Sequence, residues 1–444
     1  MRKILVAGAG HGGLTAGIML SKQGYDVTVL EAGERKNMGW DWHDMMVLSV
    51  FDEAGMERLD KKYILPAVPM AYYSPDKKGR IATPVTTNSD LVYIDRKGLC
   101  EHLIAEAEKA GVKLLFGVKV LNAVVENKRV VGVVAEKNGK KKRYTGDLII
   151  DAAGMDSPVR KSLPQVCGIQ NIIPDSQTFF VYRAYFERPE GLEDKDPYGI
   201  YLFHCKNKGM DWAIVDDDFV DLLIGSFGHT DDDIINTALR DFKEEFHLEG
   251  KKIIRGGVIG KIPLRNTLPK FVCDGYAAVG DSAAMTEPMS GSGITLSMIA
   301  GKMLAERVLE IGDGDYSTEN LWKYEYGYLK NHGMRYMGDE NLKNTLRQLS
   351  ADDINYFINV GLIGEAELNS GGIKINSIGE AMDKLKKFAP RAYVLPTLSN
   401  IVFKKYPYDR RGARDRKRYA GGRRSLKTRD HCLGRSFRRG FFRC

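Results

Sequence analysis

The sequence lacks the features of a secreted, membrane-spanning or zinc-binding protein. Its six cysteines form no Cys-x-x-Cys pair, and no cluster of Cys and His has the spacing of a zinc site. No apolar run is long enough to span a bilayer, and the first strand follows Met1 without the regions of a signal peptide. These absences predict a cytoplasmic, reducing location, no integral membrane segment and no metal site.

The excess of positive charge lies at the end of the chain and not in its body. The formal net charge is +8, but residues 409–444 hold fourteen Lys or Arg against three Asp, so residues 1–408 are slightly acidic. We therefore do not expect nucleic acid as a partner, because a nucleic-acid-binding domain carries its basic residues on a folded surface. The expected state of residues 409–444 is a disordered tail. An RNA or anionic-lipid anchor, or a chain end outside the native reading frame, are the alternatives.

The first thirty-five residues carry a phosphate-binding pattern. A strand at 4–7 runs into Gly-Ala-Gly-His-Gly-Gly beginning at Gly8, a helical pattern follows, and a second strand ends at Glu31. Gly8 allows a tight turn, Gly10 lets backbone N–H groups approach a pyrophosphate, and Gly13 lets the helix pack on the strand. Glu31 is placed to accept hydrogen bonds from ribose hydroxyls. The pattern predicts a bound dinucleotide.

Two histidines near this unit have different expected roles. His11 lies in the glycine turn beside Gly12, and because no partner is evident we interpret it as part of the binding turn rather than a catalyst. His43 lies in the run Trp-Asp-Trp-His-Asp at 40–44. It could handle protons beside a redox ring, with the indoles as stacking walls. The alternative is that the run only starts a helix expected over 46–59, with Asp41 or Asp44 as its cap.

The middle of the chain returns to the first domain after an excursion. Residues 63–94 hold four prolines among short apolar alternations, which predicts loops and strands rather than another βαβ unit. A helix over 98–110 and a strand over 112–116 follow. A small antiparallel insert is expected with strands at 118–125, 130–134 and 142–144. A buried strand from 147 then ends at Gly154.

Residues 176–262 change to a series of strands. The expected elements are strands at 177–186, 199–205, 210–215, 221–227 and 258–264, with a helix at 231–246. The series predicts a second domain on an antiparallel sheet. Such a sheet laid over a cofactor is a natural wall for a substrate cavity.

A second glycine-rich junction follows this domain. A buried strand ends at Gly280-Asp281, a loop contains Pro288, and Gly291-Ser292-Gly293 opens a long helix expected over 294–309. A carboxylate at the carboxyl end of a strand can bind a chain of hydroxyls. Backbone N–H groups at the start of a helix favour an electron-rich group, such as the N1/O2 edge of a reduced flavin.

These residues resemble those of a known family. The chain is similar to the FAD oxidoreductases of the p-hydroxybenzoate hydroxylase fold, and within them to the geranylgeranyl reductase group. The segments that carry the resemblance are the Gly8-to-Glu31 unit, residues 147–160 with Gly154, Ser157 and Arg160, and residues 275–301. The resemblance implies FAD, with Glu31 at the adenosine ribose, Asp281 at the ribityl chain and Gly293 at the isoalloxazine edge. It places the other cofactor contacts at Arg96, Val120, Gly154, Gly280, Pro288, Gly291 and Ile294.

The sequence departs from both groups at informative places. Aromatic hydroxylases normally have Ala-Asp-Gly where this chain has Ala152-Ala153-Gly154, which weakens a hydroxylase function. The Gly-Tyr-x-Trp-x-Phe-Pro stretch of the reductases appears only as Gly209 to Val215, with Trp212 but without the Tyr and Pro, which argues against a prenyl-chain substrate. The Trp-x-Trp-x-Ile-Pro signature of flavin halogenases is absent.

We expect an FAD-dependent oxidoreductase that reduces a carbon–carbon double bond of a small or medium apolar substrate. Hydride would leave the flavin while His43, or else Tyr201 or His204, or water, supplies the proton. An aromatic or organic monooxygenase that uses NAD(P)H and oxygen is the alternative, and a flavoprotein bound to RNA through its tail is a third. The electron donor is NAD(P)H, ferredoxin or another flavoprotein, and the oligomeric state is left open.

The expected fold is α/β, with the chain divided into four regions. A Rossmann-type FAD-binding domain takes residues 1–175 and 263–310, and an antiparallel substrate domain, 176–262, is inserted in it. Residues 311–408 should be helical, with helices at 318–331, 339–349, 352–360 and 376–388, and Ser350 as the cap of the third. The basic tail takes 409–444.

Overall fold

The computed structural model describes residues 2–65, 68–83, 90–193, 196–365 and 378–394. Contacts group residues 1–340 into one compact unit and 341–444 into another. The first unit holds both expected sheets, so the boundaries proposed at 175 and 263 stay a prediction. The basic tail lies outside the described residues.

The first sheet is the expected Rossmann-type sheet, with strand order β18-β19-β12-β1-β2-β8. Its parallel strands are β1 (Lys3–Ala7), β2 (Asp26–Leu30), β8 (Lys113–Leu115), β12 (Leu148–Asp151) and β19 (Tyr276–Ala278). β18 (Val272–Cys273) adds an antiparallel edge. β12 is buried throughout, as expected for an apolar strand covered on both faces.

Helices α1 (His11–Lys22), α3 (Arg96–Lys109) and α6 (Ile294–Ile311) belong to the same hydrophobic core as this sheet. α1 and α3 follow strands, and α6 is the long helix predicted after the second glycine junction. α1 and α6 approach closely because both carry glycine at the contact. A Cβ on Gly301 would lie 2.1 Å from the carbonyl oxygen of Gly12.

The small antiparallel insert is present as predicted. β9 (Lys119–Glu126), β10 (Arg129–Lys137) and β11 (Lys140–Thr145) form a three-stranded sheet in the order β11-β10-β9. The short helix α4 (Pro158–Lys161) contacts β9 and is capped by the Ser157 side chain.

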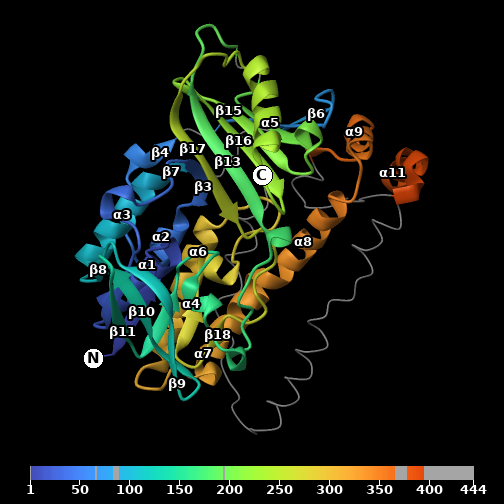
Figure 1. Cartoon of the computed structure of the whole chain (residues 1–444). Helices are drawn as coiled ribbons and strands as arrows, with labels where there is room; N and C mark the ends of the chain where they lie inside the picture. The colour runs from blue at the N-terminus through green and yellow to red at the C-terminus, as the bar shows by residue number, and fades with distance from the viewer. Residues whose placement is uncertain (1, 66–67, 84–89, 194–195, 366–377, 395–444) are drawn as a thin grey trace. The chain divides into compact units, whose positions relative to one another are not determined.

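The second large sheet has seven strands in the order β17-β13-β16-β15-β14-β5-β6. Its main strands lie close to the predicted ranges: β13 (Phe179–Glu187), β14 (Tyr198–Leu202), β15 (Met210–Val215), β16 (Phe219–Phe227) and β17 (Ile253–Ile262). The excursion adds β5 (Met70–Tyr73), parallel to β14, and β6 (Arg80–Thr83). α5 (Asp232–Glu245) lies over one face of this sheet (Figure 1).

The predicted helix over 46–59 is mostly wrong. Residues His43–Val47 form strand β3, and only Ser49–Glu53 form a short helix, α2. β3 pairs with β7 (Leu91–Asp95), which also pairs with β4 (Ile64–Leu65). Pairing with a strand more than forty residues away in the sequence therefore determines the conformation of residues 43–47. Neither Asp41 nor Asp44 caps a helix.

The remaining helices follow the prediction with shifted bounds. In the first unit, α7 (Thr318–Tyr328) continues through a π-helical turn at Leu329–Gly333. α8 (Met334–Leu346) follows directly. In the second unit, α9 (Ala351–Asn359) begins with the predicted Ser350 cap, in a capping box with Asp353, and α11 covers Ile378–Phe388. None of the described helices is long and apolar enough to cross a membrane.

Candidate functional site

The glycine turn has the tight geometry that its sequence predicts. Gly8 has a φ of +89°, and a Cβ there would lie 2.6 Å from the carbonyl oxygen of Ala152. A Cβ on Gly10 would lie 2.8 Å from the same oxygen, and one on Gly13 would lie 2.5 Å from the Ala152 Cβ. These positions leave room only for glycine, so the N-terminus of α1 is held close against β1 and β12.

Glu31 ends β2 with its carboxylate turned back to the glycine turn. Oε2 accepts a hydrogen bond from the Ala9 N–H at 2.8 Å, and Oε1 accepts one from the Gly33 N–H at 2.7 Å. The carboxylate is therefore fixed beside the turn, where each oxygen keeps further lone pairs for ribose hydroxyls.

Arg96 lies between the two glycine junctions. It is the first residue of α3, which Asp95 caps by accepting a hydrogen bond from the Gly98 N–H at 2.8 Å. Burial and the charge of Arg96 lower the pKa of His11 to about 3, so His11 is neutral. Burial raises the pKa of Asp281, and Arg96 is among the charges that oppose this rise. Arg96 Nε is buried without a hydrogen-bond partner, which leaves a cationic donor at this place.

The second junction meets the first at the start of α6. Asp281 Oδ1 accepts a hydrogen bond from the Thr286 hydroxyl at 2.8 Å, and a Cβ on Gly293 would lie 3.1 Å from that hydroxyl. Ser297 Oγ accepts a hydrogen bond from the Gly12 N–H at 3.0 Å. The glycine turn and the helix N-terminus are thus joined directly, with Asp281 beside both.

These residues fit FAD. Two glycine cradles, an arginine whose Nε has no hydrogen-bond partner, and two carboxylates supply what a pyrophosphate, a ribose and a ribityl chain need. The other predicted contacts lie in three places. Val120 is buried in β9, two residues beyond Val118, whose N–H donates to the Glu31 carbonyl oxygen. Gly154 has a φ of +81° with open space around it. Gly280, Pro288, Gly291 and Ile294 lie along the second junction.

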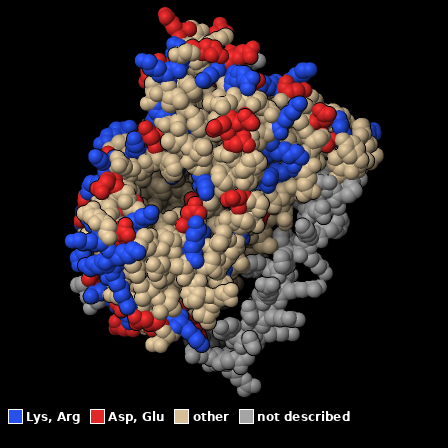
Figure 2. All heavy atoms as spheres, viewed as in Figure 1, with Lys and Arg blue, Asp and Glu red and all other residues tan. Residues whose placement is uncertain are grey.

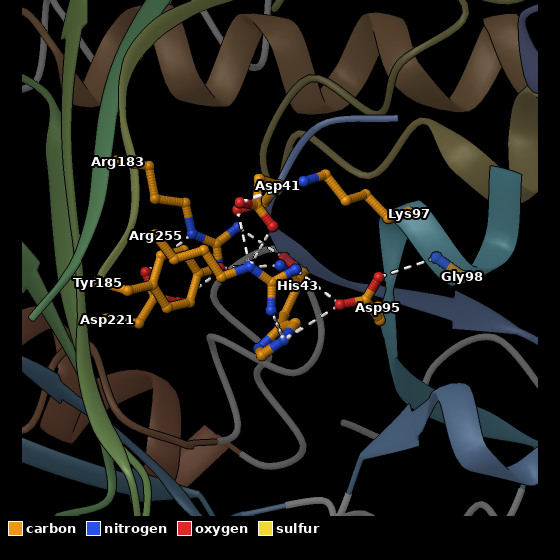
Figure 3. A network of polar contacts seen from close by, with 9 residues as sticks. All are labelled: Asp41, His43, Asp95, Lys97, Gly98, Arg183, Tyr185, Asp221 and Arg255. Carbon is orange, nitrogen blue, oxygen red and sulfur yellow. Dashed lines mark hydrogen bonds and ion pairs between the residues drawn. The ribbon is translucent and has the colours of Figure 1, made fainter. Parts of the chain in front are cut away.

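A charged network joins the cofactor side to the seven-stranded sheet (Figure 3). Arg255 of β17 lies at its centre: Nε donates to Asp41 Oδ1 and Nη2 to Asp95 Oδ2, both at 2.6 Å. Arg183 of β13 donates from Nε and Nη2 to Asp221, at 2.9 and 2.5 Å. Both members of that pair are almost fully buried.

The network holds β3 by its backbone. The His43 N–H donates to the Tyr185 hydroxyl at 2.8 Å, and the His43 carbonyl oxygen accepts from Arg183 Nη1 at 2.6 Å. At the other end of β3 the Val47 N–H donates to Thr295 Oγ1 at 3.0 Å, in the first turn of α6. Asp44 lies between, 3.0 Å from Arg96 Nη1. β3 therefore bridges the seven-stranded sheet and α6.

Figure 2 shows a hollow on the viewed face, near the place where Figure 1 has β3 and α6. Basic and acidic side chains are interspersed around it rather than gathered by sign. The rim of the hollow therefore carries no excess of one charge sign that would favour a charged substrate over an uncharged one.

His43 lies at the site, but its geometry does not suit a proton donor. Burial and the charges of Arg255 and Arg183 lower its pKa to about 4. Its Nε2 lies 2.6 Å from Arg255 Nη1, which can only donate. The ring is therefore neutral at pH 7 with its proton on Nδ1, and the role of His43 as the acid stays a prediction.

Tyr201 and His204 lie on the side of the seven-stranded sheet that α5 covers. Side chains alternate along strands, and Ile200 pairs with Trp212 while Tyr201 pairs with Asp211. Tyr201 packs in the cluster under α5, and its hydroxyl donates to Glu245 Oε1 at 3.0 Å. Burial raises its pKa. Their role as proton donors stays a prediction, with both side chains bonded to residues of α5.

Sequence reasoning missed the arginine network. Arg183 and Asp221 are charged residues within otherwise apolar strands, at positions that face the core. A charge at such a position needs a partner, so these two residues could have indicated the network from the sequence. Arg255 gave no such signal, because it lies between residues of an exposed edge strand.

Comparison with known proteins agrees with this geometry. Residues 34–307 match the FAD dependent oxidoreductase family, and residues 6–39 match an NAD(P)-binding Rossmann-like domain. The chain is 24% identical over 379 residues to digeranylgeranylglycerophospholipid reductase of Sulfolobus acidocaldarius, with 82% of each chain covered. It is 26% identical over 369 residues to the protein of that name from Methanothrix thermoacetophila, covering 79% of this chain and 89% of the relative.

Solved structures share the fold. A geranylgeranyl bacteriochlorophyll reductase-like protein from Thermoplasma acidophilum has a TM-score of 0.71 at 20% identity, covering 90% of this chain and 99% of its own. The myxobacterial chondrochloren halogenase has a TM-score of 0.61 at 17% identity, covering 85% of this chain and 91% of its own.

The family match spans more than half of the chain and includes Arg96, Gly154, Asp281 and Gly293. Together with the two joined glycine junctions, it confirms FAD as the cofactor. The chain belongs to the family of FAD-dependent oxidoreductases.

Proposed function

We propose that this protein reduces a carbon–carbon double bond of an apolar, prenyl-type lipid. The observation that carries the proposal is the pair of joined glycine junctions with Arg96 between them, in a chain whose curated relatives are named as reductases of a digeranylgeranyl lipid. Those names favour a reductase over the monooxygenase alternative. A cytoplasmic location remains a prediction.

The cofactor would be held by the residues described above. Glu31 would bind the adenosine ribose, Asp281 the ribityl chain, and Arg96 the pyrophosphate or the flavin. The N-terminus of α6 at Gly293 would stabilise negative charge on the flavin edge. When bound, FAD supplies the hydride.

The substrate would lie against the sheet face that carries aromatic rings. Trp42 and Trp212 flank Arg183, with ring centroids 5.9 and 5.2 Å from the guanidinium carbon. The Nε1 groups of both indoles are buried without a hydrogen-bond partner, so each can donate to an oxygen of a lipid head. The rings exclude water from the apolar chain.

His43 would position the substrate rather than supply the proton to it. Arg255 holds its Nε2, so Nδ1–H is the free donor of the neutral ring. Water then supplies the proton to the second carbon.

Anaerobic stopped-flow absorbance tests the proposal. The holoprotein is reduced with NADH, NADPH, reduced ferredoxin or dithionite, and then mixed with a digeranylgeranyl lipid. Reoxidation of the flavin without oxygen, with a product two hydrogens heavier, is the expected result. Reoxidation that requires oxygen and adds an oxygen atom to the substrate would establish the monooxygenase instead.

A further inference from the structure

A second polar cluster lies under α5, on the sheet face that the flavin chemistry does not use. His204 and Cys205 follow β14, and Asp241 lies on α5. His204 Nε2 lies 2.8 Å from Asp241 Oδ2 and 3.5 Å from Cys205 Sγ. The three ligand atoms all lie within 4.8 Å of one another.

We propose that His204, Cys205 and Asp241 form a binding site for one zinc-class divalent metal ion. A nitrogen, a thiolate sulfur and a carboxylate oxygen are the donors that Zn²⁺ prefers, and three protein ligands leave one position for water. Zn–S and Zn–N bonds of about 2.3 and 2.0–2.1 Å at a tetrahedral angle separate sulfur from nitrogen by about 3.6 Å. The Sγ–Nε2 distance of 3.5 Å already meets this value.

The other imidazole nitrogen has the support that metal-binding histidines usually have. Nδ1 lies 2.7 Å from Asp211 Oδ2, and Asp211 is itself fixed by the Gly225 N–H, which donates to Oδ1 at 2.9 Å. Such a carboxylate orients the ring so that Nε2 faces the metal. Asp211 is fully buried, whereas Asp241 is about a third exposed and gives the ion a path from solvent.

Lys77 is the competing cation. Its Nζ contacts Asp241 and lies 2.5 Å from Glu245 Oε2. A bound metal would displace Lys77 from Asp241, and Glu245 would keep the ammonium group paired. The site would tie the turn after β14 to α5, so it stands apart from the proposed reduction of a double bond.

Cobalt substitution of the full-length, FAD-loaded protein tests the site. After treatment with a chelator, one equivalent of Co²⁺ should give the intense d–d bands of a tetrahedral thiolate complex, at wavelengths beyond flavin absorption, and Zn²⁺ should abolish them. Cys205→Ser should lose the bands, and Asp241→Asn should weaken cobalt binding at least tenfold. Asp211→Asn should weaken binding by about 10–100-fold, because it acts through the imidazole.

The control is Cys432→Ser/Cys444→Ser, which removes the two thiols of the chain end and should keep the bands. Far-UV circular dichroism and FAD content confirm that each variant is folded. Absence of the bands in the wild type, or their survival in folded Cys205→Ser, would overturn the proposal. Loss in the tail variant would assign the metal to the tail.

Discussion

Arg183→Met is expected to lower the free energy of unfolding by about 3–5 kcal/mol, because it leaves a buried carboxylate unpaired. Arg183 is 2% exposed and Asp221 is fully buried, and the two form two hydrogen bonds. Burial raises the pKa of Asp221, and Arg183 opposes that rise. Without the guanidinium, Asp221 must either stay charged in an apolar place or take up a proton, and both cost stability.

Urea unfolding of the holoprotein measures this loss, with the fluorescence of Trp42 and Trp212 as a reporter beside the pair. Arg183→Met/Asp221→Leu should recover most of the stability, because removing both charges also removes the desolvation cost. Arg143→Met is the control: it breaks an exposed pair with Glu126 and should cost about 0–1 kcal/mol. A loss below about 1 kcal/mol in Arg183→Met, or a double variant no more stable than the single one, would refute the reasoning.

Three further predictions test the cofactor site and the core. Gly13→Ala places a Cβ 2.5 Å from the Ala152 Cβ and should reduce bound FAD per protein by at least tenfold, whereas Gly338→Ala, with open space around it, should keep its FAD; equal flavin content would contradict the packing argument. Arg96→Met should raise the Kd for FAD at least tenfold in fluorescence titration, and Arg96→Lys should restore part of the affinity; unchanged binding would remove Arg96 from the site. Burial raises the pKa of Glu325 from 4.5 to about 7, so its protonation stabilises the folded state fully below pH 4.5, and about 3 kcal/mol of this stability is lost as the pH rises through 7. The free energy of unfolding of Glu325→Gln should therefore change with pH by about 3 kcal/mol less than that of the wild type. Parallel curves of stability against pH for the two proteins would show that Glu325 is not the cause.

The sequence predicted the parts of the fold that depend on local pattern. The strand, glycine turn and helix at the N-terminus use residues within thirty positions of one another, and each glycine meets a specific close contact. The second junction was equally clear, since Gly280-Asp281 and Gly293 again mark a strand end and a helix start. Both junctions could be predicted because the residues that form a turn are consecutive in the sequence.

The errors came from non-local pairing. Residues 43–47 contain no turn or breaker, and only the ladder with β7 makes them a strand. Tyr201 and Trp212 could not be assigned to faces from the sequence, because β14 is apolar and the one charged residue of β15, Asp211, is itself buried. The position of α5 shows that Tyr201 lies on the face opposite to that of Trp212.

The charged network ties β3 to the seven-stranded sheet through hydrogen bonds to the backbone of β3. An edge strand must satisfy its free N–H and C=O groups, and β3 does so at His43 with Tyr185 and Arg183, side chains of the other sheet. Buried charges are a costly way to join two layers, since apolar residues of equal volume are often as stable. The advantage of a buried charge pair is that its hydrogen bonds are directional. A guanidinium fixes the angle and the register of the strand that it binds, whereas apolar contacts allow small shifts in register. The end of β3 contacts the start of α6, where Thr295 accepts a hydrogen bond from the Val47 N–H, so a shift in this register would displace the first turn of α6. We infer that Arg183 and Arg255 serve the geometry of the site more than its stability. If so, Arg183→Met/Asp221→Leu will keep its fold yet reoxidise reduced flavin with the lipid more slowly than the wild type.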